Sequence, residues 1–295
     1  MTQELRARVR GVGLIASGIA GWEQGRQVLR GREPWQSLPL VIPAANFMPA
    51  AERRRAGKAI RLALACGHEA VADSGCSPDD LASVFASADV DAENTHQICI
   101  ALNEAGPNLS PTRFHNSVQN AVSGYWTILT GSRAPTTMVM GADEVLAMGL
   151  LEAWAQVATS GRPALLVVFD IPMPAPLYAT HPIEGGGALA LVLDVANGEG
   201  PTMRARLVRD GPGSGPEAGS SIDRVQALRG MHPVGPALPL LAQLARWGRS
   251  GPSGGSEESG KAVPGDPHAA AGSCGPQGTA KLKFDRYHCL EVAID

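Results

Sequence analysis

Two short runs, residues 164–169 and 188–195, consist almost entirely of Ala, Val, Leu and Phe. Each run has the length of a strand, and neither alternates apolar with polar residues. A strand of this kind is buried on both faces, which requires a layer of helices on each side of its sheet. These two runs therefore predict an α/β fold with layers of helix, sheet and helix.

The segments around these runs alternate between strand-like and helix-like patterns. Further strands are predicted over residues 9–19, 81–87, 136–140 and 203–208. Helices are predicted over residues 23–29, 49–74, 116–130, 144–160 and 236–247. The apolar stripe of the helix over 116–130 consists of Val118, Val122, Trp126 and Leu129.

The composition excludes several classes of function. Hydrophobic residues make up 44% of the chain but aromatic residues only 4%, so the core must be built from small side chains. The net charge of −3 disfavours nucleic acid as a partner. No apolar run is long enough to span a membrane. The five cysteines form no CxxC pair, which indicates reduced thiols and a cytoplasmic protein.

The composition also divides the chain. Residues 1–210 carry the alternating elements and are predicted to form one domain. Residues 211–248 are interpreted as a linker with one short helix. Residues 249–279 are rich in Gly, Ser and Pro and are predicted to be disordered, because they cannot bury enough apolar surface. Residues 280–295 have a strand-like pattern and are predicted to close the fold with a strand.

Two short motifs suggest catalysis or nucleotide binding, but their surroundings do not fit. Gly11, Gly13 and Ala16 match a relaxed dinucleotide fingerprint, yet no strong amphipathic helix begins at Ala16. A glycine-bearing strand is the simpler interpretation. Ser253 lies in a hydrolase-like Gly-x-Ser-x-Gly pattern, but inside the low-complexity tract and not between a strand and a helix.

Metal binding and thiol chemistry are equally weakly supported. His96 with Cys99, and His288 with Cys289, are isolated pairs, whereas zinc needs four converging ligands. No cysteine lies at the start of an apolar helix, where its pKa would be lowered; Cys99 is the least unsuitable nucleophile. The two acids at 143–144 are interpreted as complementing the dipole of the helix that they begin. No metal or other cofactor is predicted.

A longer set of motifs carries a family resemblance. Residues 109–121 read LSPTRFHNSVQNA and are followed by Gly-Tyr-Trp at 124–126. With the opening strand at 9–14, the segment 22–35 and the Gly-rich strand at 185–192, they resemble the N-terminal half of β-ketoacyl synthases. They are most similar to the short chain-length-factor-like proteins of aryl-polyene and xanthomonadin-type clusters. The resemblance covers about residues 9–208 and implies a thiolase-like α/β/α core, truncated relative to a full condensing enzyme.

The departures from the family pattern concern catalysis. An active synthase places its cysteine in a Thr-Ala-Cys-Ser-Ser turn; here the equivalent run is residues 140–144, with Ala142 at the cysteine position. The family's catalytic histidines lie in a C-terminal half that is mostly absent, and His232 is only a faint match. No catalytic residue is therefore assigned, and whether the chain is an enzyme is left open.

The resemblance implies a function through partners. The chain is expected to pair as a heterodimer with an active ketosynthase and to meet an acyl carrier protein, in a type II fatty-acid or polyketide pathway. Five residues are expected to contact the substrate or partner: Phe114, Asn120, Trp126, Val139 and Met140. The alternatives are an active acyltransferase with an atypical nucleophile such as Cys99, and a scaffold for acyl carrier protein.

Overall fold

The computed structural model describes residues 4–104, 108–209, 233–247, 279–285 and 288–295. Within these residues one mixed sheet of eight strands forms the centre of the molecule, in the order β3-β2-β4-β5-β1-β6-β8-β7. The strands are β1 (Leu5–Ala16), β2 (Ala82–Ser87), β3 (Thr136–Met140), β4 (Ala164–Asp170), β5 (Gly187–Asp194), β6 (Thr202–Arg209), β7 (Ala280–Lys283) and β8 (His288–Ile294). Strands β2, β3 and β4 are parallel to one another, and every other neighbouring pair is antiparallel.

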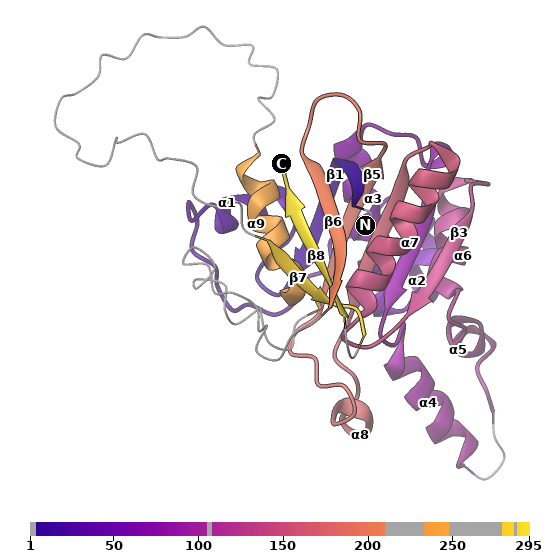
Figure 1. Ribbon diagram of the computed structural model, residues 1–295. Helices are drawn as coiled ribbons and strands as arrows, with labels where there is room; N and C mark the ends of the chain where they lie inside the picture. The colour runs from indigo at the N-terminus through magenta and orange to yellow at the C-terminus, as the bar shows by residue number, and fades with distance from the viewer. Residues whose placement is uncertain (1–3, 105–107, 210–232, 248–278, 286–287) are drawn as a thin grey trace, which may run out of the picture.

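Helices cover both faces of this sheet (Figure 1), which confirms the predicted layers. The longer ones are α1 (Trp22–Leu29), α3 (Lys58–Ser74), α4 (Ala92–Leu102), α6 (Ala121–Thr130), α7 (Val145–Ser160) and α9 (Leu238–Arg246). Helices α3 and α6 pack on one face, whereas α7, α1 and α9 pack on the other. No helix of the described residues is both long and apolar enough to cross a membrane.

Strand β4 shows why the sequence specifies this layering. All seven of its residues are buried. Leu166 and Val168 face the core under α7, and Leu165, Val167 and Phe169 face the core under α3, because successive strand side chains point to opposite faces. The prediction of a strand buried on both faces is confirmed here and for β5.

The glycines of β1 serve packing between a helix and the sheet. A Cβ atom on Gly11 would lie 2.2 Å from the Ala70 carbonyl oxygen, and one on Gly13 would lie 2.3 Å from that of Cys66. Helix α3 therefore approaches β1 closely at both positions. Both glycines lie within the strand and no helix begins at Ala16, so the glycine-bearing strand is the correct interpretation of the fingerprint.

Two predicted helices are broken in the structure. The one over 49–74 divides into α2 (Ala50–Arg55) and α3, because Ala56 and Gly57 are extended. The one over 116–130 begins only at Ala121, as α6, and Asn116 instead ends a short helix, α5 (Pro111–Asn116). The side-chain amide of Asn116 holds both breaks together, since it donates to the Arg55 carbonyl oxygen at 2.8 Å. Val118 therefore lies outside α6 and is exposed, which corrects its place in the stripe.

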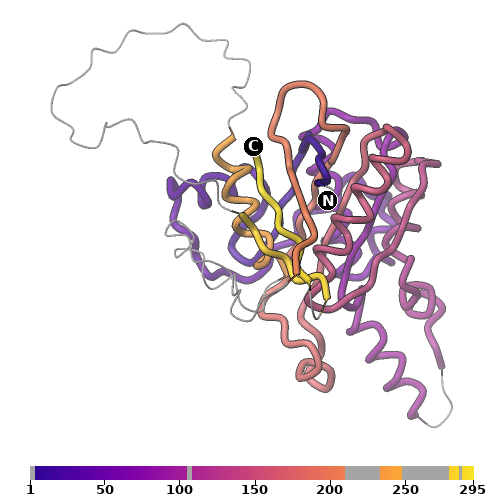
Figure 2. Tube along the Cα trace, in the orientation of Figure 1, coloured from indigo at the N-terminus to yellow at the C-terminus, as the bar shows by residue number. Residues whose placement is uncertain are grey.

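Helix α4 was not predicted, and it projects from the body of the molecule together with α5 (Figure 2). Only Ala92 and Asn94 of α4 are buried, so its sequence has no apolar stripe to reveal it. Its start is fixed instead by Asp91, whose carboxylate accepts a hydrogen bond from the Asn94 N–H at 3.1 Å.

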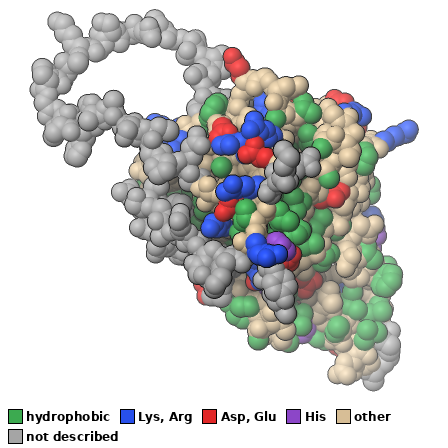
Figure 3. All heavy atoms as spheres, in the orientation of Figure 1, with side chains coloured by type: hydrophobic (Ala, Val, Ile, Leu, Met, Phe, Trp, Pro, Cys, Tyr) green, Lys and Arg blue, Asp and Glu red, His purple; other side chains and the backbone are tan. Residues whose placement is uncertain are grey.

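The predicted closing strand is a hairpin, β7 and β8, that extends the sheet from β6. The helix predicted over 236–247 is confirmed as α9, preceded by a short 3₁₀ turn. Figure 3 shows charged side chains gathered over this part of the sheet, where Arg206 pairs with Glu291 at 2.7 Å. The tract 249–278, with Ser253, as well as His232 and the linker 211–221, lies outside the described residues.

Candidate functional site

The candidate site is the turn between β3 and α7. Strand β3 is one of the two edge strands of the described sheet, and Met140 at its end pairs with Ser87 at the end of β2. The Gly141 N–H donates to the Ser87 carbonyl oxygen at 3.4 Å, so the chain leaves the sheet beside β2 before α7 begins at Val145. The first N–H groups of a helix have no partner within the helix and carry a partial positive charge. Residues in the turn just before α7 therefore lie next to these groups.

Ala142 occupies the middle of this turn and is exposed. Its carbonyl oxygen accepts a hydrogen bond from the Val145 N–H at 3.3 Å, which makes it part of the turn that opens α7. Its side chain is a methyl group and offers neither a nucleophile nor a proton. The fold thus provides the helix N-terminus that would activate a thiol, with a residue that cannot use it.

Lys283 of β7 lies against the same turn. Its ammonium group is 3.1 Å from a carboxylate oxygen of Asp143 and 3.1 Å from one of Glu144. Hydrogen bonds to Glu144 and Asp143 raise the pKa of Lys283. The interpretation of the two acids as dipole partners is thus incomplete, because they also bind the C-terminal hairpin to the turn. No sequence pattern predicts this contact, because the residues are 140 positions apart.

Sequence analysis missed a buried carboxylate. It lies at the same end of the sheet as the turn, at the carboxyl end of β4. Asp170 ends β4, and one of its oxygens accepts hydrogen bonds from the Ser87 hydroxyl at 2.7 Å and the Ala88 N–H at 2.9 Å. Burial raises the pKa of Asp170 to about 7, against the opposing effect of these hydrogen bonds. An acid at the end of an otherwise apolar run was the available signal.

The predicted partner residues fall into two groups. Val139 and Met140 belong to β3 and are half-buried, whereas Phe114 of α5 is 64% exposed and Asn120, just before α6, is exposed as well. Trp126 is only 2% exposed and makes an edge-to-face contact with Phe85, with ring centroids 6.0 Å apart. It belongs to the core of this chain, which corrects its assignment to the partner-facing set.

The thiol and metal alternatives receive no support from the geometry. Cys99 is exposed, but it lies near the end of α4 and not at a helix N-terminus. Burial raises the pKa of the Cys66 thiol well above its usual value, which keeps it protonated. Among the described residues no three His, Cys, Asp or Glu side chains converge on a possible metal position.

The layered core with a strand, turn and long helix at its edge is the architecture of thiolase-like condensing enzymes. A family model described as the β-ketoacyl synthase N-terminal domain matches residues 22–229, more than half of the chain. The chain therefore belongs to this family, and it is short relative to full condensing enzymes.

Solved structures agree on the fold. A chain of the ketosynthase (ApeO) in complex with its chain length factor (ApeC) from Xenorhabdus doucetiae matches with a TM-score of 0.66 and 19% identity, over 98% of this chain and 99% of that one. The ishigamide ketosynthase/chain length factor matches at 0.57 and 13%, over 70% and 68%. The AntDE:AntF complex of a type II carrier protein with its ketosynthase matches at 0.50 and 14%, over 66% and 59%. No curated protein sequence matches the chain.

Proposed function

We propose that this chain is a non-catalytic, chain-length-factor-like subunit that pairs with an active β-ketoacyl synthase in a type II fatty-acid or aryl-polyene-type pathway. The observation that carries the proposal is Ala142 in the turn between β3 and α7. The helix N-terminus at this turn suits a thiolate, but an alanine cannot attack a thioester. A chain that keeps the fold and lacks the nucleophile contributes through its surfaces.

The partner surface we propose is the β3 edge with its flanking helices. An unpaired edge strand presents free N–H and C=O groups that a second chain can pair with. Helices α6 and α7 both pack against β3. Large apolar side chains are exposed on α5, α6 and α7, namely Phe114, Ile128 and Met148, with Val118 between the first two helices. Apolar side chains also gather over α4 and α5 in Figure 3. Large apolar side chains that are exposed together are typical of a partner interface.

The comparisons support the pairing. The ApeO–ApeC match spans nearly all of both chains, so a chain of this length occurs in a complex of a ketosynthase with its chain length factor. The AntDE:AntF complex contains an acyl-carrier protein, and we propose the same class of partner for this assembly. Cys66, Cys76 and Cys99 carry free thiols, which fits an assembly in the cytoplasm.

The test is co-purification followed by an assay of condensation. We expect the chain alone to form no product from acyl and malonyl thioesters of a carrier protein, and to co-purify with an intact ketosynthase encoded near its gene. Ala142→Ser should leave both results unchanged. Steady product formation by the lone chain, lost on Cys99→Ala, would instead favour the atypical synthase. Binding of carrier protein without any ketosynthase would favour the scaffold.

A further inference from the structure

Helices α4 and α5 form an arm that projects from the body of the molecule (Figure 2). The buried residues of these two helices lie at the root of the arm: Ala92 and Asn94 in the first turn of α4, and Asn116 at the end of α5. The side-chain amide of Asn94 joins the two helices by donating to the Arg113 carbonyl oxygen at 2.6 Å. Asn116 joins α5 to the Arg55 carbonyl oxygen at the end of α2. A few contacts at the root, and not an apolar core, therefore fix the orientation of the arm.

Asp170 holds the segment that leads from β2 into this arm. The strand pairing between β2 and β4 ends at Ala86. Beyond that point one carboxylate oxygen of Asp170 takes the place of the backbone acceptors. It accepts hydrogen bonds from the Ser87 hydroxyl at 2.7 Å, the Ala88 N–H at 2.9 Å and the Asp89 N–H at 3.4 Å. Helix α4 begins three residues after this group of contacts, so the end of β4 anchors the root of the arm.

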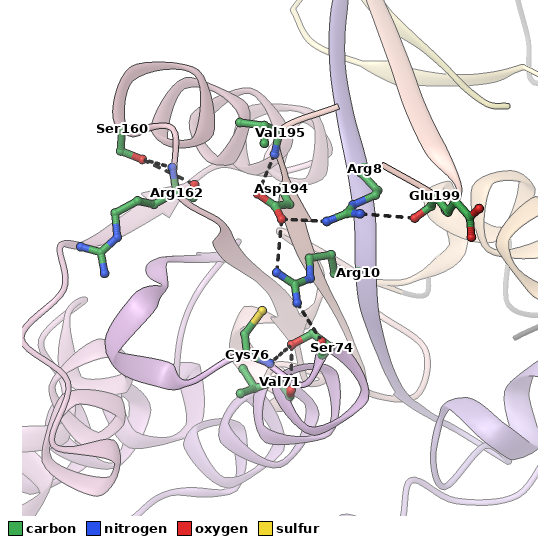
Figure 4. A network of polar contacts seen from close by, with 10 residues as sticks. All are labelled: Arg8, Arg10, Val71, Ser74, Cys76, Ser160, Arg162, Asp194, Val195 and Glu199. Atoms are coloured by element: carbon green, nitrogen blue, oxygen red, sulfur yellow. Dashed lines mark hydrogen bonds and ion pairs between the residues drawn. The ribbon is translucent and has the colours of Figure 1, made fainter. Parts of the chain in front are cut away.

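A second carboxylate shows what is unusual about this anchor. Asp194 ends β5 as Asp170 ends β4, and both residues are buried. Asp194 is paired with the guanidinium groups of Arg8 and Arg10 at 3.0 and 3.3 Å (Figure 4). The donors on Asp170 are neutral, and none of the described residues forms an ion pair with it. Burial accordingly raises the pKa of Asp170 to about 7, so this group gains or loses its proton near neutral pH.

Two more carboxyl groups, those of Asp89 and Asp91, lie in the segment between β2 and α4. Burial raises the pKa of each, and repulsion from Asp89 adds to the raised pKa of both Asp91 and Asp170. Asp91 also packs against the start of α3, where a Cβ atom on Gly57 would lie 2.3 Å from one of its carboxylate oxygens. The other charged groups that act on these carboxyls are Glu93 on α4, Arg113 on α5 and His181 in the loop before β5.

Loss of these protons places negative charges where the arm joins the body. Burial opposes the charged forms there, whereas water solvates them once the root is exposed. An arm that swings away from the body exposes the carboxyl groups and returns their pKa to ordinary values. The docked arm therefore binds more protons than the released arm. By linkage, this contribution to docking is complete at low pH and is lost as the pH rises through 7, the value for Asp170.

We propose that Asp170, Asp89 and Asp91 form a proton-sensitive hinge, which holds the arm of α4 and α5 on the body below neutral pH and releases it as the three groups ionise. The arm carries exposed apolar side chains, among them Leu102 and Phe114, so the hinge controls how this surface meets a second protein. A fixed arm loses less conformational freedom on binding, and pairing is therefore tighter at pH 6 than at pH 8. The effect on pairing rests on the function proposed above, whereas the motion of the arm does not.

The test is single-molecule energy transfer between one dye on the arm and one on the body of the full chain. Cys99 of α4 is exposed and takes the first dye, and Ala158→Cys at the exposed end of α7 takes the second. Cys76 and Cys274 are replaced by Ser in every sample. The ratio of released to docked arms should rise about tenfold between pH 6 and pH 8, because the pKa of Asp170 falls from about 7 toward its ordinary 3.8 on release.

Two variants assign the effect to the hinge. Asp170→Asn keeps an acceptor oxygen and cannot ionise, so it should remove most of the rise. The matched control Asp80→Asn, at an exposed acid that pairs with Arg162, should keep it. Thermal midpoints show that each variant is folded. An arm that does not move between pH 6 and pH 8, or an equal rise in Asp170→Asn, would overturn the proposal.

Co-purification with the ketosynthase at the two pH values separates the hinge from the proposed function. Stronger pairing at pH 6, lost in Asp170→Asn, supports the control of pairing by the hinge. Equal pairing at both pH values, with an arm that moves, would overturn that control. Failure to pair at either pH, with an arm that still moves as expected, would count against the proposed function and leave the hinge supported.

Discussion

Strands β3 and β4 are both parallel neighbours of β2, yet they differ in how deeply they are buried. All residues of β4 are buried, whereas no residue of β3 is fully buried. Both strands end at the same edge of the sheet, β4 in the buried Asp170 and β3 in the exposed turn at Ala142. The comparison indicates that contacts within this chain fully cover β4, whereas β3 still has exposed surface and one unpaired edge that a partner could cover.

A charge in β4 should unfold the chain. We expect Val167→Asp to lower the free energy of unfolding by roughly 4 kcal/mol or more, because the carboxylate would be buried between Trp126 and α3 without a partner. Loss of the cooperative thermal transition checks this. The matched control Val167→Ile adds one methylene group and should cost no more than ~1–3 kcal/mol. A stable, cooperatively folded aspartate variant would show that β4 is not part of the core.

The end of β4 should make stability depend on pH. The pKa of Asp170 is about 7 in the folded chain and near 3.8 when unfolded, so the folded chain binds more protons between these values. The favourable contribution is therefore complete below pH 4 and is lost as the pH rises through 7, a fall of ~2–3 kcal/mol between pH 5 and pH 8. Chemical denaturation across this range measures the slope.

The variant Asp170→Asn isolates this contribution. It should remove most of the dependence of the unfolding free energy on pH. A smaller dependence should remain, because burial also raises the pKa of Asp89. An unchanged slope in Asp170→Asn would assign the pH dependence to other groups and leave the end of β4 without this role.

A charge in β3 should disturb the partner more than the chain. Val139 is half-buried, so in Val139→Arg the guanidinium group can reach water, at a cost of ~1 kcal/mol to the free energy of unfolding. Co-purification with the ketosynthase should nevertheless be lost, because pairing would bury that charge. Val139→Thr, of similar shape and without a charge, should retain the partner. Wild-type stoichiometry with the arginine variant would place the interface elsewhere.

The ion pairs at the turn after β3 should matter least for stability. Lys283 is half-exposed, so we expect Lys283→Gln to lower the free energy of unfolding by less than ~1 kcal/mol. Faster hydrogen exchange at the amides of β7 would show that the hairpin is held to α7 through this residue. Equal exchange in both proteins would show that strand pairing with β8 alone fixes the hairpin.

The sequence by itself determined the central layers of the fold. The apolar runs that became β4 and β5 are buried on both faces, and that requirement is local to each run. Ala142 could be located from the resemblance, since its turn lies between two elements with clear patterns. The breaks near Ala56 and Ser117 could not be predicted from the apolar stripes of the two helices. They are held by a hydrogen bond from the side-chain amide of Asn116 to the Arg55 carbonyl oxygen, 61 residues away in sequence.

Tertiary structure alone decided the contacts between distant residues. Trp126 has the residue type of an interface anchor, but burial against Phe85 places it in the core. The pairing of Lys283 with the turn joins two segments that share no pattern in sequence. Periodicity reports which face of an element is buried, whereas only the packing of elements decides which side chains meet.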